Sequence, residues 1–244
     1  MTTLFISDLH LADTRPGVTR LFLDFLRGPA RNADALYILG DLFEYWAGDD
    51  DLDEPLNRAV ASALGKLADD RVKTFFMAGN RDFLIGDDFA QRSGLAQLDD
   101  STVIDLDGTP TLLMHGDTLC TDDLAYQQFR DTVRAPAYIA QFLAQPLTAR
   151  KAQIAAIRER SEADKETKTA QIMDVNRDAV VAAFRRHAAA RLIHGHTHRP
   201  ALHAWTADGR RRQRWVLSDW ETSPARGSIR SLAEIHGTDE GRPE

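Results

Sequence analysis

The chain has 244 residues, with 37 acidic and 30 basic side chains and a formal net charge of −7. This length suits one large domain or one domain with a sizeable insertion. A content of 43% hydrophobic and 27% charged residues excludes a disordered chain, a collagen-like repeat and a disulfide scaffold. The negative charge disfavours a protein that binds nucleic acid, because it would repel phosphate.

Cysteine content and hydropathy limit the cellular setting. A single cysteine, Cys120, excludes an internal disulfide and a multi-cysteine zinc site, and it is compatible with a reducing compartment. The first residues lack the basic segment of a signal peptide, and no run approaches the roughly 18 apolar residues of a membrane span. We therefore expect the protein to stay inside the cell.

Strand-like and helix-like segments alternate along the first third of the chain. Residues 3–7, 35–39 and 73–77 are short apolar runs that predict strands. Residues 19–27 and 56–68 place apolar side chains at helical spacing. This alternation predicts a layered α/β or αββα architecture.

More strands are predicted further along the chain. Residues 102–106 and 111–114 form an expected pair, joined by the turn dipeptide Asp107-Gly108. A late strand is expected at 214–217, after a second Asp-Gly turn.

One long segment lacks strand patterns. From 123 to 187 the pattern is helical, and Pro136 and Pro146 divide it into separate helices. We therefore predict a core formed by residues 1–122 and 188–236, a helical cap insertion at 123–187, and a disordered tail at 237–244.

Five short motifs follow predicted strands, at the sheet edge where layered α/β proteins bind ligands. They are Asp8-Leu9-His10, Gly40-Asp41, Gly79-Asn80-Arg81-Asp82, His115-Gly116-Asp117 and Gly195-His196-Thr197-His198.

The motifs supply more metal donors than one ion needs. These are Asp8, His10, Asp41, Asn80, His115, His196 and His198. Divided between two ions that share one carboxylate, the set predicts a dinuclear centre, with Asp41 as the natural bridge. Mixed imidazole and oxygen donors suit Mn²⁺, Fe²⁺ or Zn²⁺ better than Ca²⁺ or Mg²⁺.

The order of these five motifs resembles the calcineurin-like metallophosphoesterase superfamily, from about residue 4 to 217. Longer phrases are similar to the UDP-2,3-diacylglucosamine pyrophosphatase family of lipid A biosynthesis. They are LYILGDLFE (36–44), GNRDFL (79–84), MHGDTLCTDD (114–123), IMDVN (172–176) and IHGHTHRP (193–200).

The resemblance implies an αββα sandwich with a helical cap and two Mn²⁺ per chain. It implies hydrolysis of UDP-2,3-diacylglucosamine to UMP and 2,3-diacylglucosamine 1-phosphate, by activated water attacking the α-phosphorus. The implied ligands are Asp8, His10, Asp41 and His198 for one ion, and Asp41, Asn80, His115 and His196 for the other.

The same resemblance implies the residues that contact substrate. Asp41, Asn80 and Arg81 would be catalytic. Arg81 stands where many superfamily members have a histidine, and its guanidinium can bind phosphate but cannot donate a proton at neutral pH. The implied substrate contacts are Asn80, Arg81, Asp123, Ser161, Lys165, Lys168 and His196, with Tyr126 and Arg158 as further pocket residues. Lys165 departs from the family pattern, since some relatives have an amide at this position.

The insertion differs in charge from the rest of the chain. Residues 130–168 contain eight basic and five acidic side chains, a net charge of +3, which leaves −10 for the remainder. A basic, apolar cap suits an anionic lipid and an anionic bilayer surface. We therefore expect peripheral association with the cytoplasmic side of the inner membrane, no nucleic-acid partner and no obligate protein partner.

Other interpretations remain open. The chain could be a metallophosphoesterase acting on nucleotides or phosphoproteins, or a scaffold without activity. The acidic residues 49–51 are interpreted as a solvated loop and His194 as a core or supporting residue. Asp82 and Asp117 either orient neighbouring ligands or form turns.

Overall fold

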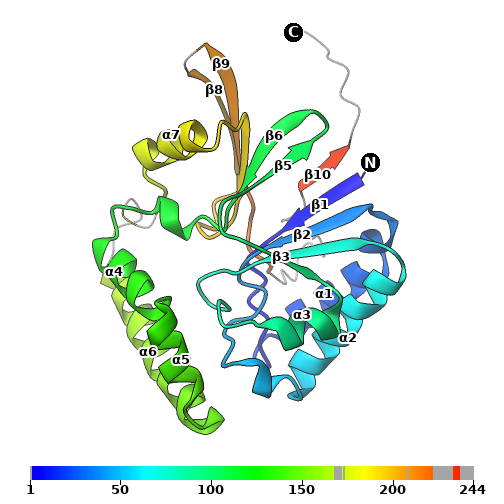
Figure 1. Ribbon diagram of the computed structural model, residues 1–244, viewed down its shortest axis with the longest axis vertical. Helices are drawn as coiled ribbons and strands as arrows, with labels where there is room; N and C mark the ends of the chain where they lie inside the picture. The colour runs from blue at the N-terminus through cyan, green and yellow to red at the C-terminus, as the bar shows by residue number, and fades with distance from the viewer. Residues whose placement is uncertain (1, 168–171, 173, 208, 222–232, 237–244) are drawn as a thin grey trace.

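Figure 1 shows the computed structural model, which describes residues 2–167, 172, 174–207, 209–221 and 233–236. Two five-stranded sheets pack against each other, and helices cover the outer face of each. The predicted αββα sandwich with a helical insertion is confirmed. The predicted tail at 237–244 lies outside the described residues.

The first sheet has the strand order β10-β1-β2-β3-β4. Strands β1 (Thr2–Ile6), β2 (Ala35–Leu39), β3 (Lys73–Met77) and β4 (Ala96–Leu98) run parallel. Strand β10 (Ala233–His236) pairs antiparallel with β1. The carboxyl ends of β1, β2 and β3 therefore meet at one edge.

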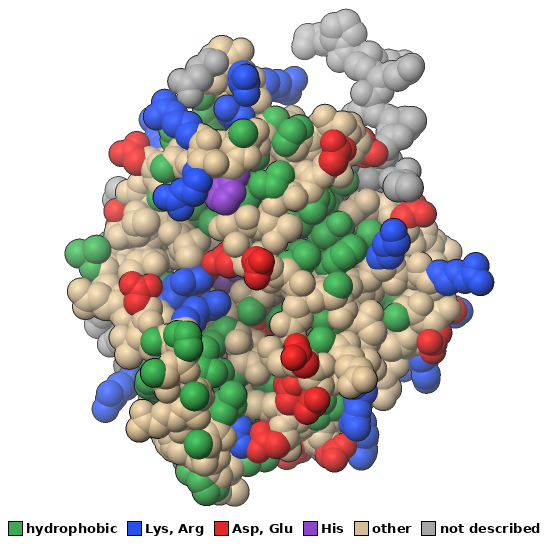
Figure 2. Space-filling view, viewed as in Figure 1, with side chains coloured by type: hydrophobic (Ala, Val, Ile, Leu, Met, Phe, Trp, Pro, Cys, Tyr) green, Lys and Arg blue, Asp and Glu red, His purple; other side chains and the backbone are tan. Residues whose placement is uncertain are grey.

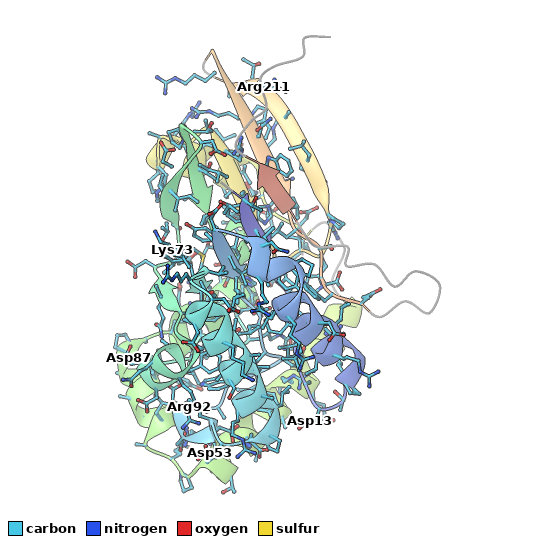
Figure 3. The ribbon with its side chains drawn as sticks, turned by 90° about the vertical axis from the view of Figure 1, so that its right-hand side faces the viewer. Asp13, Asp53, Lys73, Asp87, Arg92 and Arg211 are labelled. Atoms are coloured by element: carbon cyan, nitrogen blue, oxygen red, sulfur yellow. The ribbon has the colours of Figure 1, made fainter. Side chains whose placement is uncertain are left out.

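Three helices cover the outer face of this sheet, in front of it in Figure 3. They are α1 (Pro16–Arg27), α2 (Pro55–Asp69) and α3 (Asp87–Ser93). Alternation along β1 sends Ile6 into the core beneath these helices, whereas Phe5 enters the core between the sheets.

The second sheet has the order β5-β6-β7-β9-β8. Its strands are β5 (Thr102–Leu106), β6 (Thr109–Leu113), β7 (Arg191–His194), β8 (Ala201–Ala207) and β9 (Arg210–Val216). Strands β6 and β7 are parallel, so their carboxyl ends also lie at one edge.

Helix α7 (Arg177–Arg186) covers the outer face of the second sheet. The Asn176 side chain caps it by accepting hydrogen bonds from two backbone N–H groups. Phe184 packs in one apolar cluster with Leu112 and Leu192 of the sheet. By chain position α7 falls within the predicted insertion, yet its apolar contacts are with the sheet.

The remaining insertion helices form the cap, which we define as α4 (Leu124–Val133), α5 (Pro136–Leu143) and α6 (Leu147–Thr167). They lie beside one another at the lower left of Figure 1. Helix α5 begins at Pro136 and α6 begins directly after Pro146, as predicted. No described helix is both long enough and apolar enough to cross a membrane.

Basic side chains of the cap bind acidic and carbonyl groups of the core. Arg150 is 2% exposed and contacts the Ala47 carbonyl and Asp50, while Lys151 Nζ lies 2.7 Å from Asp51 Oδ1. The other cap residues that do so are Arg130, Arg134 and Arg158. The structure describes the side chains of six of the eight basic residues counted in the insertion, and five of these six contact the core.

The acidic run at 49–51 differs from its prediction as a solvated loop. Asp51 is buried, and the Asp49 carboxylate accepts hydrogen bonds from Gly86, Asp88 and Phe89 N–H groups at 2.9–3.1 Å. Asp49 thus stabilises the start of α3 from a distant loop.

Candidate functional site

The five motifs converge on one end of the sandwich. Asp8, Asp41 and Asn80 follow β1, β2 and β3 in the first sheet, while His115 and His196 follow β6 and β7 in the second. Parallel strands place these positions at matching edges, and face-to-face packing brings the two edges together.

Five of the seven predicted metal donors have left-handed backbone conformations, with φ between 51° and 67°. They are Asp8, His10, Asp41, His196 and His198. Such conformations cost about 1–3 kcal/mol each for residues other than glycine and concentrate at functional sites. The surrounding fold must therefore hold each of these backbones in place.

One group of donors surrounds a point beside Asp8. The Nε2 atoms of His10 and His198 are 3.3 Å apart, and His198 Nε2 lies 3.4 Å from Asp8 Oδ1. His10 Nε2 lies 3.7 Å from Asp41 Oδ2. Two carboxylates and two imidazoles thus point their donor atoms at one small volume.

A second group lies on the other side of Asp41. Asn80 Oδ1 lies 3.0 Å from both His115 Nε2 and His196 Nδ1. His115 Nε2 is 3.7 Å from Asp41 Oδ2, the oxygen that also faces His10. Asp41 Oδ2 is therefore shared by the two groups.

Hydrogen bonds occupy the other atoms of these side chains. Asp41 Oδ1 accepts from the Arg81 N–H at 2.9 Å, and Asp8 Oδ2 accepts from Ser7 Oγ at 2.6 Å and the His196 N–H at 2.9 Å. His115 Nδ1 lies 2.9 Å from the Leu39 carbonyl oxygen, to which it donates. These bonds leave Asp41 Oδ2, Asp8 Oδ1 and His115 Nε2 directed into the site.

The electrostatics of the site fit a cation. Asp8 Oδ1 is buried and accepts no hydrogen bond within the described residues. Burial alone would lower the pKa of His115, but the charges of Asp41, Asp117 and Asp8 outweigh it and raise that pKa to about 9. The carboxylates therefore attract positive charge, and the donor set matches what a divalent transition metal requires.

Glycines give the donors the space they need. A Cβ on Gly79 would lie 2.1 Å from Asp41 Oδ1, and one on Gly195 would lie 2.2 Å from Asp8 Oδ2. A Cβ on Gly40 would lie 2.5 Å from His115 Nδ1. Side chains at these positions would displace the donors, which explains the glycines at positions 40, 79 and 195.

Asp82 fastens two of the motif loops together. Its buried carboxylate accepts hydrogen bonds from the N–H groups of Gly79 at 2.8 Å and Leu42 at 2.7 Å. It therefore fixes the loop that carries Asp41 against the loop that carries Asn80. This contact agrees with an orienting role for Asp82.

Asp117 connects the second group to the cap. Its Oδ2 accepts hydrogen bonds from Tyr126 OH and Arg130 Nε, each at 2.7 Å. Burial would raise the pKa of Asp117, but His115, His196 and nearby guanidiniums keep it well below its usual range. Helix α4 is therefore held against the loop that carries His115.

The residues predicted to bind substrate differ in their contacts within the structure. Arg158 Nη2 lies 2.6 Å from Glu44 Oε1, and the Tyr126 ring centroid lies 5.9 Å from that of His196. Asp123 caps α4 by accepting a hydrogen bond from the Tyr126 N–H. Ser161 follows Arg158 by three positions on α6, so the two share a helix face. The side chain of Lys165 and the whole of Lys168 lie outside the described residues.

Sequence reasoning missed Glu44, although it lies in a phrase singled out there. Glu44 Oε2 is 3.0 Å from His10 Nδ1, and its Oε1 is 3.9 Å from Arg81 Nη1. Burial would raise the pKa of Glu44, but the close contact with His10 and the charges of His10, Arg81 and Arg158 lower it to about 2. A glutamate three residues after Asp41 was the available signal.

His194 behaves as predicted, and the single cysteine is buried as well. His194 is fully buried, with Nδ1 2.9 Å from the Gly195 carbonyl oxygen and Nε2 3.2 Å from Arg214 Nη1, so it supports the loop beneath the site. Cys120 is buried, and burial raises the pKa of its thiol to about 12. A thiol of that kind is not a nucleophile.

Known proteins resemble this chain closely. The calcineurin-like phosphoesterase family matches residues 1–200. A UDP-2,3-diacylglucosamine hydrolase of Aromatoleum aromaticum is 56% identical over 220 residues, which cover 90% of this chain and 89% of that protein. Proteins of the same name from Stenotrophomonas maltophilia and Cellvibrio japonicus are 56% and 54% identical, each over 90% of this chain and 91% of the relative.

The substitution Gly79→Ala tests the packing of the site. The new methyl group would overlap Asp41 Oδ1 and displace the shared oxygen, so we expect Mn²⁺ affinity to fall by about 10–100-fold. Isothermal titration calorimetry measures this. Gly108→Ala is the control, because nothing lies near its added Cβ, and the strain expected at its φ of 76° is confined to the turn between β5 and β6, at the opposite end of β6 from His115. Unchanged Mn²⁺ affinity in Gly79→Ala would contradict the assigned site.

Proposed function

Because this chain belongs to the calcineurin-like phosphoesterase family and is a hydrolase, we propose that it hydrolyses the pyrophosphate bond of UDP-2,3-diacylglucosamine. The products would be UMP and 2,3-diacylglucosamine 1-phosphate, an intermediate of lipid A biosynthesis. The similarity to UDP-2,3-diacylglucosamine hydrolases over 90% of the chain carries the substrate assignment. The shared Asp41 Oδ2, at 3.7 Å from two imidazoles of different groups, supports a two-metal hydrolase.

The proposed cofactor is a pair of Mn²⁺ ions. Asp8, His10, Asp41 and His198 would hold one, and Asp41, Asn80, His115 and His196 the other. When bound, such a pair supplies a hydroxide at neutral pH and neutralises charge on phosphoryl oxygens. The donor set and the family resemblance support both the choice of manganese and the count of two.

The protein's own side chains would orient the pyrophosphate. Asn80 and His196 line the site, and Arg81 is anchored there because its N–H binds Asp41 and its carbonyl accepts from the Trp46 N–H. The Arg81 guanidinium would donate to phosphate oxygens and neutralise charge that develops there. Attack of water oxygen on the α-phosphorus forms UMP, and the bridging oxygen leaves with the sugar phosphate as a stable anion. That leaving group needs no proton from Arg81.

Cap residues would complete the substrate site. Arg158 Nε is buried without a hydrogen-bond partner among the described residues, while its Nη2 is bound to Glu44. The contact with Glu44 thus holds the guanidinium in place, and because the Arg158 side chain is 34% exposed, its remaining Nη N–H groups are the donors proposed for a phosphate oxygen. Ser161, on the same face of α6, Asp123 and Tyr126 are proposed further contacts, as are Lys165 and Lys168.

We also propose peripheral association with the cytoplasmic side of the inner membrane. Figure 2 shows hydrophobic side chains gathered over the cap, at the lower left. Leu124, Phe129 and Leu143 are 69%, 43% and 39% exposed there. Since most cap arginines contact the core, apolar contact is the larger part of the proposed attraction.

A panel of substrates tests the proposed reaction. With Mn²⁺, the protein is expected to release UMP from UDP-2,3-diacylglucosamine, and not from an unacylated UDP-sugar or a model phosphodiester. In heavy-oxygen water the label should enter UMP, since water attacks the α-phosphorus. Equal turnover of the unacylated UDP-sugar would contradict the assigned substrate.

The role of Arg81 has its own test. Arg81→Ala is expected to keep wild-type Mn²⁺ affinity and to lose about 100-fold or more in kcat, because it removes charge stabilisation but no metal donor. Asp41→Ala is the matched comparison and should lose Mn²⁺ binding and hydrolysis together. Full activity in Asp41→Ala would overturn the two-metal mechanism.

Vesicle flotation tests the membrane proposal. The protein is expected to bind anionic vesicles, and Phe129→Glu should weaken binding by roughly tenfold because it places a charge in the apolar contact. Leu202→Glu serves as the control, since Leu202 is 53% exposed on β8, outside the cap. Absence of vesicle binding at low salt would contradict association.

A further inference from the structure

Glu44 lies where the metal-donor loops meet the cap. Its N–H donates to the Leu11 carbonyl oxygen at 3.0 Å, and Leu11 forms a β-bridge with Phe43. These contacts fix Glu44 beside the loop that carries His10. The Glu44 side chain is 14% exposed, so its partners are mainly protein groups and not water.

The two carboxylate oxygens of Glu44 have different partners. Oε2 lies 3.0 Å from His10 Nδ1, the ring atom on the opposite side from Nε2, which faces the other donors. Oε1 lies 2.6 Å from Arg158 Nη2 on the cap and 3.9 Å from Arg81 Nη1 on the core. One side chain therefore contacts a metal donor and two phosphate-binding candidates.

The residues joined in this way come from three distant parts of the chain. His10 follows β1, Arg81 follows β3, and Arg158 lies on α6 of the cap, 114 positions from Glu44. Arg158 is held at one end of its guanidinium, and its buried Nε has no partner among the described residues. This arrangement fixes the guanidinium, and because the side chain is 34% exposed, other Nη N–H groups stay within reach of substrate.

We infer that Glu44 is a positioning residue that couples the cap to the reaction centre. Through Oε2 it orients the His10 imidazole, and through Oε1 it sets the place of the Arg158 guanidinium relative to Arg81. Glu44 does not touch substrate; it acts through these three side chains. This inference rests on the proposed function, because it assigns Arg158 and Arg81 to the same phosphate groups.

A simple alternative is that Glu44 is one of several ion pairs that attach the cap to the core. The chain contains a matched example of such a pair, because Lys151 of α6 lies 3.1 Å from Glu54 Oε1. That pair also joins the cap to the core, but Glu54 is 48% exposed and contacts none of the predicted metal donors. Loss of Glu54 therefore weakens one attachment of the cap, where Lys151 keeps only its 2.7 Å contact with Asp51, without disturbing a predicted metal donor.

A double-mutant cycle separates the two accounts. With Mn²⁺ at saturation and UDP-2,3-diacylglucosamine varied below and above its KM, Glu44→Gln should lower kcat/KM by about 10–100-fold in the wild-type background. In an Arg158→Ala background the same change should cost at least threefold less, because the group it positions is gone. Glu54→Gln should leave kcat/KM within about twofold of wild type, since exposed pairs contribute little.

Mn²⁺ titration provides a measurement that needs no substrate. Glu44→Gln should lower Mn²⁺ affinity by about tenfold through His10, whereas Arg158→Ala and Glu54→Gln should leave it unchanged. Glu44→Asp, which keeps the charge but is one methylene shorter, offers a second route to the same cycle if Glu44→Gln folds poorly.

The outcomes are distinct. Equal losses from Glu44→Gln in both backgrounds, or wild-type Mn²⁺ affinity in Glu44→Gln, would overturn the inference. Failure of the wild-type protein to hydrolyse UDP-2,3-diacylglucosamine would contradict the proposed function instead, and the Mn²⁺ titration would still test the contact between Glu44 and His10.

Discussion

The structure depends on the division of the Asp41 carboxylate between two tasks. Oδ1 accepts the Arg81 N–H, which fixes the side chain, and Oδ2 faces both His10 and His115. This geometry requires a left-handed backbone at Asp41 and no side chain at Gly79. It also requires Asp82 to hold the two loops together with its buried carboxylate. The sandwich supplies these conditions because parallel strands deliver their carboxyl ends to one edge.

The opposite charges of the core and insertion have a structural use. Cap arginines bind Asp117, Asp50 and Glu44, so the basic surface of the insertion is largely turned toward the acidic core. Two of these acidic residues, Asp117 and Glu44, lie beside the predicted metal donors His115 and His10. The position of the cap is therefore set by the same loops that carry the proposed metal donors.

Much of the fold and site could be predicted from sequence, because the relevant signals are local. Each donor motif directly follows an apolar strand, and Pro136 and Pro146 mark the starts of cap helices. Contacts between distant residues left no such signal: Arg158 meets Glu44 across 114 positions. The three-residue strand β4 and the antiparallel pairing of β10 with β1 were also missed, because neither has a distinctive periodicity.

The central claim is that one carboxylate oxygen serves two metal ions at once. Electron paramagnetic resonance of the protein loaded with two equivalents of Mn²⁺ tests it most directly, since ions bridged by Asp41 are close enough for their electron spins to couple. We predict the multiline spectrum of an exchange-coupled Mn²⁺ pair. A spectrum of isolated Mn²⁺ ions at the same loading, or saturation at one ion per chain, would contradict the account.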